Sequence, residues 1–451
     1  MFSLKKWNGV LSLLVGDLSI AFAIFSLYAV LCGSFADHLN DIFIFCCLIV
    51  LSCAVNRFYA FIESYHLFEL FLRVWDGFLL TLLLILAYYL LLHQGKVDPF
   101  FIVPTLITFC CLFCFRFWVF FCIESNREQL IILGANSLSR KLIREVNKRP
   151  FRNFTLSAVF TSQEKDNMDS FEGIPVNFTF DNLEDYVWKQ EIDCIIIALR
   201  DRRGKIPSNE LLRLKTRNVS ILEGFNFYEQ LTRTIIVDDF LKPSWFIYEK
   251  GFKSSAFLSS MKRVQGVLLS LLLLILLAPV YLMIAILVKL ESSGPVLFRQ
   301  KRVGMQGKIF TLYKFRSMKQ EHNKEQMQTV FTSKNDPRLT RVGKIIRKIR
   351  LDEIPQLINI LKGDMNMVGP RPEQPEFVEK LRFLIPYYDL RHTIRPGLTG
   401  WAQVRYQYGE SFEHSHQKLH YDLYYVKHRS WFLDFQIVML TFWSVLLCRG
   451  Q

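Results

Sequence analysis

Acidic residues are scarce in this 451-residue sequence, and recognisable metal or nucleic-acid motifs are lacking. It has 41 Asp and Glu against 55 Lys and Arg, and its net charge of +14 favours anionic partners such as phosphate ligands or lipid headgroups. None of its nine histidines belongs to an H-E-x-x-H motif, so we expect no metal centre of that kind. No nucleic-acid-binding motif occurs, which excludes nucleic acid as an expected partner.

Cysteines that could form a disulfide framework are also lacking. Eight of the ten lie in or beside apolar runs, where cysteine behaves as a small apolar residue. The C-x-x-C spacing of Cys111 and Cys114 falls inside such a run without partner ligands. We therefore predict that the polar parts of the chain are reduced and cytosolic. Lys5 and Lys6 precede the first apolar run without a small-residue cleavage site, which predicts an uncleaved anchor.

Long hydrophobic runs dominate residues 1–125 and predict a transmembrane four-helix bundle. Asp17 and Arg116 interrupt the first and last runs, but each can span if its polar groups face a neighbouring helix. Lys and Arg are concentrated before the first run, between the second and third runs, and after the fourth. Because such residues favour the cytoplasmic side, we predict that both ends of the bundle lie in the cytoplasm. The four runs are about Val10–Cys32, Ile42–Val55, Trp75–Leu92 and Phe100–Ile123.

Residues 126–224 change to short apolar strands, such as "QLIILG" and "IDCIIIAL", that alternate with amphipathic helices. This alternation predicts a Rossmann-like, doubly wound parallel α/β module. Its first turn begins at Gly134 and holds only one of the three glycines of G-x-G-x-x-G, so the dinucleotide fingerprint fails. A structural or regulatory module without cofactor is favoured, and a small-ligand or docking role stays open. Residues 225–260 are predicted to be a connector.

The segment Val264–Val288 holds 25 uncharged residues, enough to cross a bilayer. Lys262 and Arg263 precede it and Lys289 follows it, so both flanks are predicted to be cytoplasmic. Pro279 removes a backbone hydrogen bond near the middle and bends the helix. We predict a re-entrant helix over residues 264–288 that enters one leaflet and returns. A kinked full span is the alternative.

Two adjacent carboxylates, Asp352 and Glu353, follow a basic region: Arg299 to Arg350 holds 15 Lys and Arg against 3 Asp and Glu. In one interpretation Asp352 caps the next helix, and the negative charge of Glu353 is stabilised by the positive end of that helix's dipole. In another, the helix start and nearby Arg347 and Arg350 favour the charged form of Asp352, which keeps it an anion able to attack phosphorus. Glu353 would then hold a hard cation such as Mg²⁺ beside a diphosphate.

Two further segments have amphipathic patterns. Ile345, Ile346 and Ile349 are predicted to share one face of a helix with basic residues around it, which suits a lipid surface or a wall beside phosphates. The segment Trp431–Cys448 fits a helix lying in the membrane interface slightly better than a further crossing.

Four motifs resemble those of a known family. "KRVGMQGKIFTLYKFRSM", "RLDEIPQLINILKGDMNMVGPRPE", "RPGLTGWAQV" and "KLHYDLYYVKH" occur in the order found in bacterial sugar transferases that start glycan assembly, the polyprenyl-phosphate hexose-1-phosphate transferases. The resemblance covers about Ser260 to the C-terminus. The long form of that family also has four membrane helices and a nucleotide-fold-like module before its catalytic part. Residues 261–451 are therefore expected to be a mainly α catalytic domain.

The resemblance implies a two-step reaction in which Asp352 attacks the β-phosphorus of a UDP-sugar, releases UMP and carries a phospho-sugar. Polyprenyl phosphate, such as undecaprenyl phosphate, then accepts the hexose 1-phosphate, which starts exopolysaccharide, capsule or O-antigen assembly. The resemblance also implies a Mg²⁺ ion at Glu353 and a place at the cytoplasmic face of the bacterial inner membrane. The residues that it implies for phosphate or substrate binding are Arg347, Arg371, Lys314, Arg316 and Arg395, and it places the helix break at Pro279, where Ala278 replaces a more usual Ser or Lys.

Two other functions are compatible with the sequence. The central module could serve a sugar-nucleotide epimerase or dehydratase, against which the glycine-poor turn at Gly134 speaks. The chain could also be a non-enzymatic membrane scaffold in which Asp352 is only a helix cap. A homo-oligomer is compatible with the sequence, which does not specify the oligomeric state.

Overall fold

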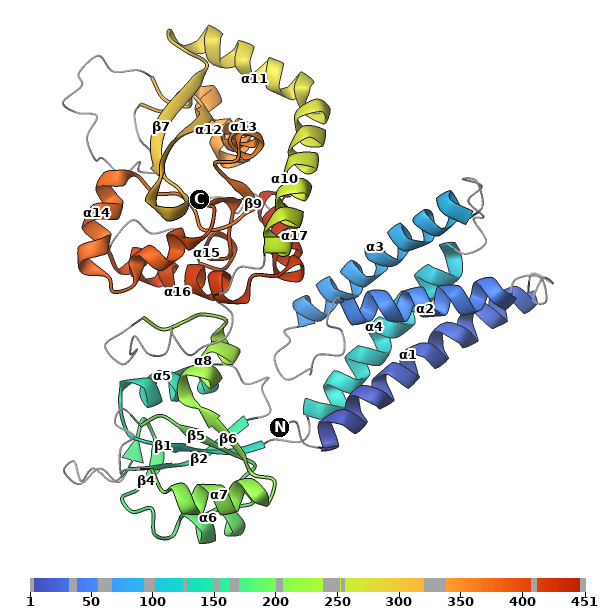
Figure 1. Cartoon of the computed structure of the whole chain (residues 1–451), viewed down its shortest axis with the longest axis vertical. Coiled ribbons are helices and arrows are strands. Elements are labelled where there is room, and N and C mark those ends of the chain that lie inside the picture. Colours follow the sequence, from blue (N-terminus) through green and yellow to red (C-terminus); the bar gives the residue numbers. More distant parts are fainter. Residues whose placement is uncertain are drawn as a thin grey trace. The chain divides into compact units, whose positions relative to one another are not determined.

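The computed structural model divides into two compact units, Met1–Leu231 and Thr232–Gln451 (Figure 1). The predicted orientation in the membrane depends on loops at residues 93–99 and 35–41, and the first of these and most of the second lie outside the described residues. Residues 238–251 and 253–255 of the predicted connector also lie outside them. The described residues are 4–31, 39–55, 67–92, 102–124, 128–148, 154–161, 170–199, 206–237, 252, 256–319, 338–406 and 412–446.

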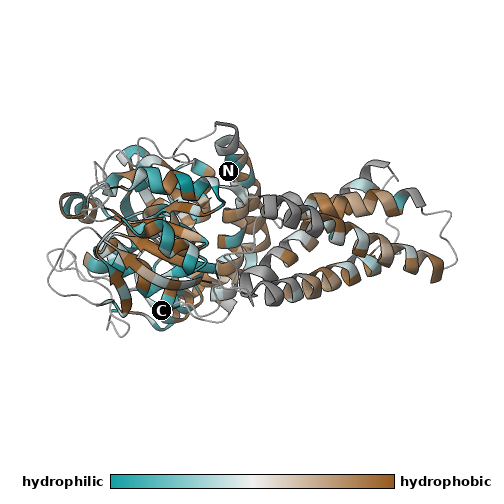
Figure 2. Ribbon diagram, turned by 90° about the horizontal axis from the view of Figure 1, so that it is seen from below, coloured by the Kyte–Doolittle hydropathy of each residue, from teal (hydrophilic) through white to brown (hydrophobic). Residues whose placement is uncertain are grey.

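Four long helices pack around one apolar core in the first unit. Helices α1 and α3 each contact both α2 and α4, and buried side chains such as Phe25, Phe45 and Leu112 fill the space between them. Asp17 is fully buried among these helices, as expected for a polar group that faces a neighbouring helix. The outer faces are apolar (Figure 2). The helices are α1 (Leu4–Leu31), α2 (Leu39–Val55), α3 (Leu67–Leu92) and α4 (Ile102–Glu124).

Two helices of the described part are long and apolar enough to cross a bilayer. These stretches are Leu14–Leu31 in α1 and Ser259–Leu276 in a helix of the second unit. The apolar stretches in α2, α3 and α4 are shorter. Membrane association is therefore supported, while a bundle that spans the membrane four times stays a prediction.

A parallel sheet forms the second part of the first unit, as the alternating pattern predicts. Five parallel strands lie in the order β4-β2-β1-β5-β6, and β3 pairs antiparallel with β4 at one edge. This is a doubly wound arrangement. Its elements are β1 (Glu128–Leu133), α5 (Ser137–Asn147), β2 (Phe154–Phe160), β3 (Ser170–Phe171), β4 (Ile174–Asn177), α6 (Leu183–Lys189), β5 (Cys194–Ile197), α7 (Ser208–Thr216) and β6 (Ser220–Glu223).

The start of the predicted connector is helical. Helix α8 (Gly224–Thr232) begins directly after β6, and its Phe227 packs edge to face on Phe154 of β2 with ring centroids 5.6 Å apart. A Cβ on Gly224 would lie 3.1 Å from the carbonyl oxygen of Ile197. This segment is therefore part of the module because it packs closely on the sheet. The helix propensity of its residues does not indicate such packing.

Asn136 occupies the position where a dinucleotide-binding fold would hold pyrophosphate. Its Oδ1 accepts hydrogen bonds from the backbone N–H groups of Leu138 (3.0 Å) and Ser139 (3.1 Å), and its Nδ2 donates to the carbonyl of Ala198. Gly134 has φ +111° and approaches Ala198 so closely that a Cβ would lie 2.9 Å from its oxygen. Two of the N-terminal N–H groups of α5, where a phosphate would bind in such a fold, thus already donate to a side chain of the chain itself.

The second unit begins with a broken helix. Helix α10 (Ala256–Leu276) ends and α11 (Ala278–Glu291) begins around Leu277, two residues before Pro279, and Figure 1 shows the two arms at an angle. Many of the large apolar side chains on both arms are exposed, including Leu276 (68%) and Leu290 (79%). Such exposure is unusual in water and suits a lipid environment. That the broken helix dips into one leaflet stays a prediction.

The rest of the second unit is mainly helical and frames a β-hairpin. Strands β7 and β8 pair antiparallel, and short strands β9 and β10 pair parallel. The elements are β7 (Leu297–Val303), the 3₁₀ turn η3 (Met305–Gly307), β8 (Ile309–Phe315), α12 (Arg341–Lys348), the 3₁₀ turn η5 (Leu351–Glu353), α13 (Gln356–Lys362), β9 (Asn366–Val368), α14 (Pro375–Leu384), the 3₁₀ turn η6 (Tyr388–Thr393), β10 (Gly397–Thr399), α15 (Trp401–Arg405), α16 (Phe412–His428) and α17 (Trp431–Leu446).

The predicted apolar face of α12 is only partly correct. Ile346 is 3% exposed and packs among residues of α11 and β8, whereas Ile345 is 61% exposed. Neighbouring positions on a helix point about 100° apart, so they cannot share one narrow contact.

Candidate active site

Asp352 and Glu353, hereafter the dyad, lie in the 3₁₀ turn η5 between α12 and α13. Both residues are buried, with 8% of their surface exposed in each case. Arg350 immediately before the turn has φ +56°, a left-handed conformation that costs a non-glycine residue about 1 kcal/mol or more. Backbone strain and two buried carboxylates within four residues are typical of a functional site.

The dyad does not cap a helix. Helix α13 begins at Gln356 after Pro355, and no side chain accepts a hydrogen bond at its N-cap. Asp352 therefore stands nearly one turn too early for the cap predicted as an alternative. The interpretation of the dyad as a helix cap is wrong, because the chain completes a separate 3₁₀ turn before α13 starts.

Two cations contact Glu353. Its Oε1 accepts from Nζ of Lys314 at 3.0 Å and from Nη2 of Arg371 at 2.7 Å. Lys314 comes from β8 and Arg371 from the loop after β9, so the turn brings together segments far apart in sequence. Burial alone would raise the pKa of Glu353, but Arg371 and Lys314 hold it well below its usual range. Glu353 is therefore an anion at any physiological pH.

The pKa of Asp352 shifts in the opposite direction from the prediction. Burial and the charge of Glu353 raise it to about 6, while Lys314, Arg347 and Arg371 act to lower it. Arg347 lowers the pKa of Asp352 as expected, but burial and the adjacent carboxylate outweigh it. Since the pKa lies about one unit below neutrality, roughly nine-tenths of Asp352 is ionised at pH 7.

Arg316 and Arg395, predicted to bind substrate, contact helix ends in this structure, and a role in substrate binding stays a prediction for both. Arg316 is 6% exposed and donates to the carbonyls of Ser293 (2.9 Å) and Ser292 (2.7 Å) at the end of α11. Arg395 Nε donates to the carbonyl of Gly363 (3.1 Å) at the end of α13. Lys314, Arg371 and Arg347 are the predicted cations that act on the dyad directly, the last through its charge.

Both arms of the broken helix are tied to the helices that flank the dyad. Arg263 of α10 donates to the carbonyls of Ile360 and Leu361 at the end of α13, the latter at 2.7 Å. The carboxylate of Glu291, the last residue of α11, accepts from the backbone N–H groups of Arg341 and Val342 at the start of α12. The position of the dyad thus depends on how the two arms are held.

Asn359 is a buried site residue that the sequence interpretation missed. It is fully buried in α13, where its Oδ1 accepts from the N–H of Tyr313 (3.1 Å) and its Nδ2 donates to the carbonyl of Thr311 (2.7 Å) and to Asp364 Oδ2 (3.1 Å). These bonds fix α13 against β8, the strand that carries Lys314. An amide between Ile358 and Ile360 in an apolar segment was the available signal.

We expect Asn359→Leu to lower the free energy of unfolding by about 2 to 4 kcal/mol, because a buried N–H and a buried carbonyl lose their partners. Denaturant unfolding of the purified chain measures this. Gln417→Leu on the exposed side of α16 is the matched control and should change stability by less than about 0.5 kcal/mol. Equal effects of the two substitutions would show that Asn359 does not hold α13 to β8.

Comparison with known proteins identifies the class. The sequence profile described as bacterial sugar transferase matches residues 257–448, which include the whole dyad region, and one described as CoA-binding domain matches residues 58–222. Both profiles together cover most of the chain.

Named relatives point to the same family. The chain is 34% identical to a UDP-glucose:undecaprenyl-phosphate glucose-1-phosphate transferase of Klebsiella pneumoniae over 330 residues, 70% of this chain and 67% of that one. It is 47% identical to a UDP-N-acetylgalactosamine-undecaprenyl-phosphate N-acetylgalactosaminephosphotransferase of Aeromonas hydrophila over 42% of this chain and 44% of the relative. It is 41% identical to an exopolysaccharide production protein of Rhizobium leguminosarum bv. phaseoli over 42% of this chain and 97% of the relative. The chain belongs to the bacterial sugar transferase family, and the prediction of an enzyme of the transferase class is confirmed.

Proposed function

We propose that this chain transfers a hexose 1-phosphate from a UDP-sugar to a polyprenyl phosphate, such as undecaprenyl phosphate, and releases UMP. Relatives named for this reaction use glucose in one case and N-acetylgalactosamine in another, so the names support the class of donor and leave the sugar open. The observation that carries the proposal is the buried dyad, with an ionisable Asp352 beside an anionic Glu353 that Lys314 and Arg371 hold.

In the first step an Oδ atom of Asp352 attacks the β-phosphorus of the donor. The new Asp352–phosphorus bond forms as the bond from that phosphorus to the oxygen bridging the α-phosphate breaks, and UMP leaves with the bridging oxygen. Repulsion between an aspartate and an anionic diphosphate opposes this approach, and Lys314, Arg347 and Arg371 offset it through their positive charge.

In the second step an oxygen of the polyprenyl phosphate attacks the same phosphorus. The bond to Asp352 breaks, the aspartate is regenerated and a polyprenyl diphosphate sugar results. The raised pKa of Asp352 indicates a carboxylate that is poorly stabilised in its free state, which favours covalent attack. The exposed apolar arms of α10 and α11 are suited to place the dyad close to a lipid acceptor.

The dyad fits a Mg²⁺ ion that arrives with the donor. The described residues contain no cluster of three or more metal-ligating side chains, so a cation bound entirely by protein groups is not supported there. Mg²⁺ in phosphate sites takes one or two carboxylates, one of which Glu353 would supply here, and completes its shell with phosphate oxygens and water. When bound, the ion would neutralise charge on the diphosphate.

We further propose that the catalytic part faces the cytoplasm at the bacterial inner membrane, where a nucleotide sugar is available, and that the product starts exopolysaccharide, capsule or O-antigen assembly. The similarity to an exopolysaccharide production protein supports the first of these glycans. To test the orientation, a cysteine is introduced at the exposed position Lys380 and intact cells are treated with a thiol reagent that cannot cross the membrane. We expect no labelling. Labelling from outside would contradict it.

The test of the proposed reaction is UMP release by the purified chain in detergent with Mg²⁺, undecaprenyl phosphate and a panel of UDP-hexoses. At least one donor should give both UMP and a lipid-linked sugar diphosphate, identified by mass spectrometry. If no UDP-hexose in the panel yields UMP, the proposed function is wrong.

We expect the rate of UMP release at limiting donor to fall about tenfold per pH unit below pH 6, because protonation removes the nucleophile. Glu353 stays ionised throughout this range since its pKa lies far lower. Lys314→Met should move this acid limb to higher pH, because Lys314 lowers the pKa of Asp352. If the rate of a folded Lys314→Met variant falls over the same acid pH range as that of the wild type, Asp352 does not determine the loss of activity in acid.

A further inference from the structure

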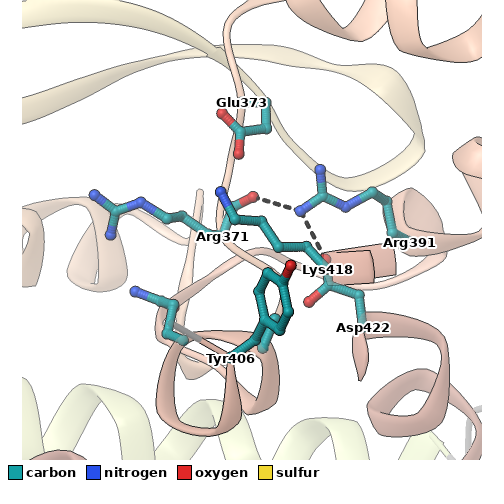
Figure 3. A pocket seen from close by; sticks show the side chains of 8 residues that line it. Arg371, Glu373, Arg391, Tyr406, Lys418 and Asp422 are labelled. Atoms are coloured by element: carbon teal, nitrogen blue, oxygen red, sulfur yellow. Dashed lines mark hydrogen bonds and ion pairs between the residues drawn. The ribbon is translucent and has the colours of Figure 1, made fainter. Parts of the chain in front are cut away.

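Arg371 is held by its main chain as well as by its side chain. Its guanidinium donates from Nη2 to Oε1 of Glu353 at 2.7 Å, and its carbonyl oxygen accepts from Nη2 of Arg391 at 2.9 Å (Figure 3). Arg391 comes from the 3₁₀ turn η6, 20 residues further along the chain. One residue thus contacts the dyad through its side chain and a buried arginine through its carbonyl.

Arg391 is itself fixed by buried acceptors. Its Nη2, which has two hydrogens, also lies 2.8 Å from Oδ2 of Asp422 in α16, and the two side chains are only 6% and 2% exposed. Its Nη1 donates to the hydroxyl of buried Tyr388. A guanidinium is a planar fork, so acceptors on two of its nitrogens fix its orientation. The direction of the hydrogen bond that Arg371 accepts is therefore fixed as well.

The cavity beside this ion pair is too small for a substrate. Arg391 and Asp422 help to line it, and its volume of about 20 Å³ has room for about one water molecule. A buried ion pair is also a weak source of stability, because the attraction only roughly offsets the lost hydration and apolar side chains of similar volume stabilise as well. We therefore look for the role of the pair in the group that it holds.

The segment around Arg371 is held largely through its carbonyls. Pro370 and Pro372, on either side of it, have a fixed φ and no N–H group. The carbonyl of Pro372 accepts from Nη1 of Arg302 at 3.1 Å. Neither proline fixes the rotation of Arg371 about its own Cα–C bond, which sets the direction of its carbonyl relative to its side chain. The hydrogen bond from Arg391 restrains that rotation.

We infer that Arg391 and Asp422 are positioning residues for the proposed transfer, an inference that rests on the proposed function. They orient the main chain of Arg371 so that its guanidinium reaches Glu353 and the charge that develops on the diphosphate. They act through Arg371 and do not touch the donor. A displacement of about 1 Å at such a group costs about 10²-fold in rate, because stabilisation of developing charge depends on preorganised geometry.

The test replaces the pair by apolar side chains, Arg391→Met together with Asp422→Leu. Removing one partner alone would leave a buried charge unpaired and could unfold the chain. With a UDP-sugar, Mg²⁺ and undecaprenyl phosphate, kcat for UMP release should fall about 10- to 100-fold. The KM for the UDP-sugar should change less than about threefold, because Arg371 acts on charge that develops in the transition state. Thermal melts establish that the variant is folded.

A second background separates positioning from general damage. In a chain that already carries Arg371→Met, the pair replacement should lower kcat further by less than about threefold, because the residue through which the pair acts is gone. The matched control, Arg382→Met with Asp389→Leu, removes an exposed Arg–Asp ion pair at the same 3₁₀ turn and should leave kcat unchanged. If the pair replacement does not fold, Tyr388→Phe removes one acceptor of Arg391 and should lower kcat about three- to tenfold, again only when Arg371 is present.

Two results would overturn the inference while the proposed function stands. One is a folded pair variant whose kcat lies within twofold of the wild type. The other is an equal fall in kcat with and without Arg371, which would show that the pair only supports the fold. A wild-type chain that releases no UMP from any donor would instead refute the proposed function itself.

Discussion

Asp352→Asn should abolish UMP release and at the same time stabilise the fold. An amide of the same shape cannot form the covalent bond to phosphorus, so we expect the rate to fall by at least about 10³-fold. The stability effect follows from burial: the ionised carboxylate is disfavoured in the folded chain, where its pKa is raised to about 6, relative to the unfolded chain, where it titrates near 3.8.

The sign of the stability change depends on pH in a defined way. As pH rises from about 4 to 6, the unfolded chain loses the proton of Asp352 first, so the wild-type chain loses stability over that window. Asparagine has no such loss. The variant should therefore be more stable by about 1 to 3 kcal/mol above pH 6, and this gain should vanish below about pH 4.

Denaturant unfolding at pH 4 and pH 7.5, together with UMP release, measures both effects. Asp185→Asn at an exposed position of α6 is the control and should alter neither stability nor rate. An Asp352→Asn chain that keeps wild-type turnover would remove the aspartate from the mechanism. One that is inactive and destabilised at pH 7.5 would instead contradict the buried, strained state of the carboxylate.

Arg371→Met should have the second largest effect. It removes one of the two cations on Glu353 and a charge that opposes the repulsion between aspartate and diphosphate, so we expect the maximal rate to fall about 10²- to 10³-fold. Among the described residues Glu353 then keeps the ion pair with Lys314, and a buried carboxylate that loses a partner costs stability. Because Arg371 is 29% exposed at its side chain, water compensates part of that cost, and we expect a loss of about 1 to 3 kcal/mol.

The pH dependence distinguishes this cause from general damage. The folded pKa of Glu353 is depressed, so its contribution to stability is present above about pH 4.5 and is lost as pH falls. The difference between Arg371→Met and wild type should therefore shrink in acid. Arg382→Met removes a comparable but exposed ion pair with Asp389 and should cost less than about 1 kcal/mol. A constant deficit at all pH values would indicate lost packing and not a lost charge pair.

The periodic parts of this fold were predictable and the long-range contacts were not. Strand β5 and the last four residues of β1 are uniformly apolar because helices cover both faces of a parallel sheet, and that pattern is visible in the sequence. Helix α8 was missed because its stability comes from Phe227 packing on β2, some 70 residues earlier. Strands β3 and β4 of the hairpin have only two and four residues, too few to carry a periodic signal.

The dyad was predictable because two carboxylates in a basic region stand out by composition alone. Its electrostatics were not, since the direction of the shift at Asp352 depends on how deeply the turn is buried. The contacts of the arginines were hidden: the sequence sets Arg371 apart by the prolines on either side of it, but it does not show that Arg316 holds the carbonyls at the end of α11 or that Arg371 reaches Glu353. Which arginine pairs with a carboxylate and which holds a helix end is decided by tertiary structure.

The central claim is tested most directly by mass spectrometry of the chain after incubation with a UDP-sugar donor and Mg²⁺, without lipid acceptor. The account predicts a hexose-phosphate adduct on the peptide that contains Asp352, absent from Asp352→Asn and removed when undecaprenyl phosphate is added. If the chain forms UMP and the lipid-linked product once undecaprenyl phosphate is added, yet the acceptor-free sample carries no adduct on that peptide under conditions that trap acyl phosphates, transfer is direct and the account is contradicted.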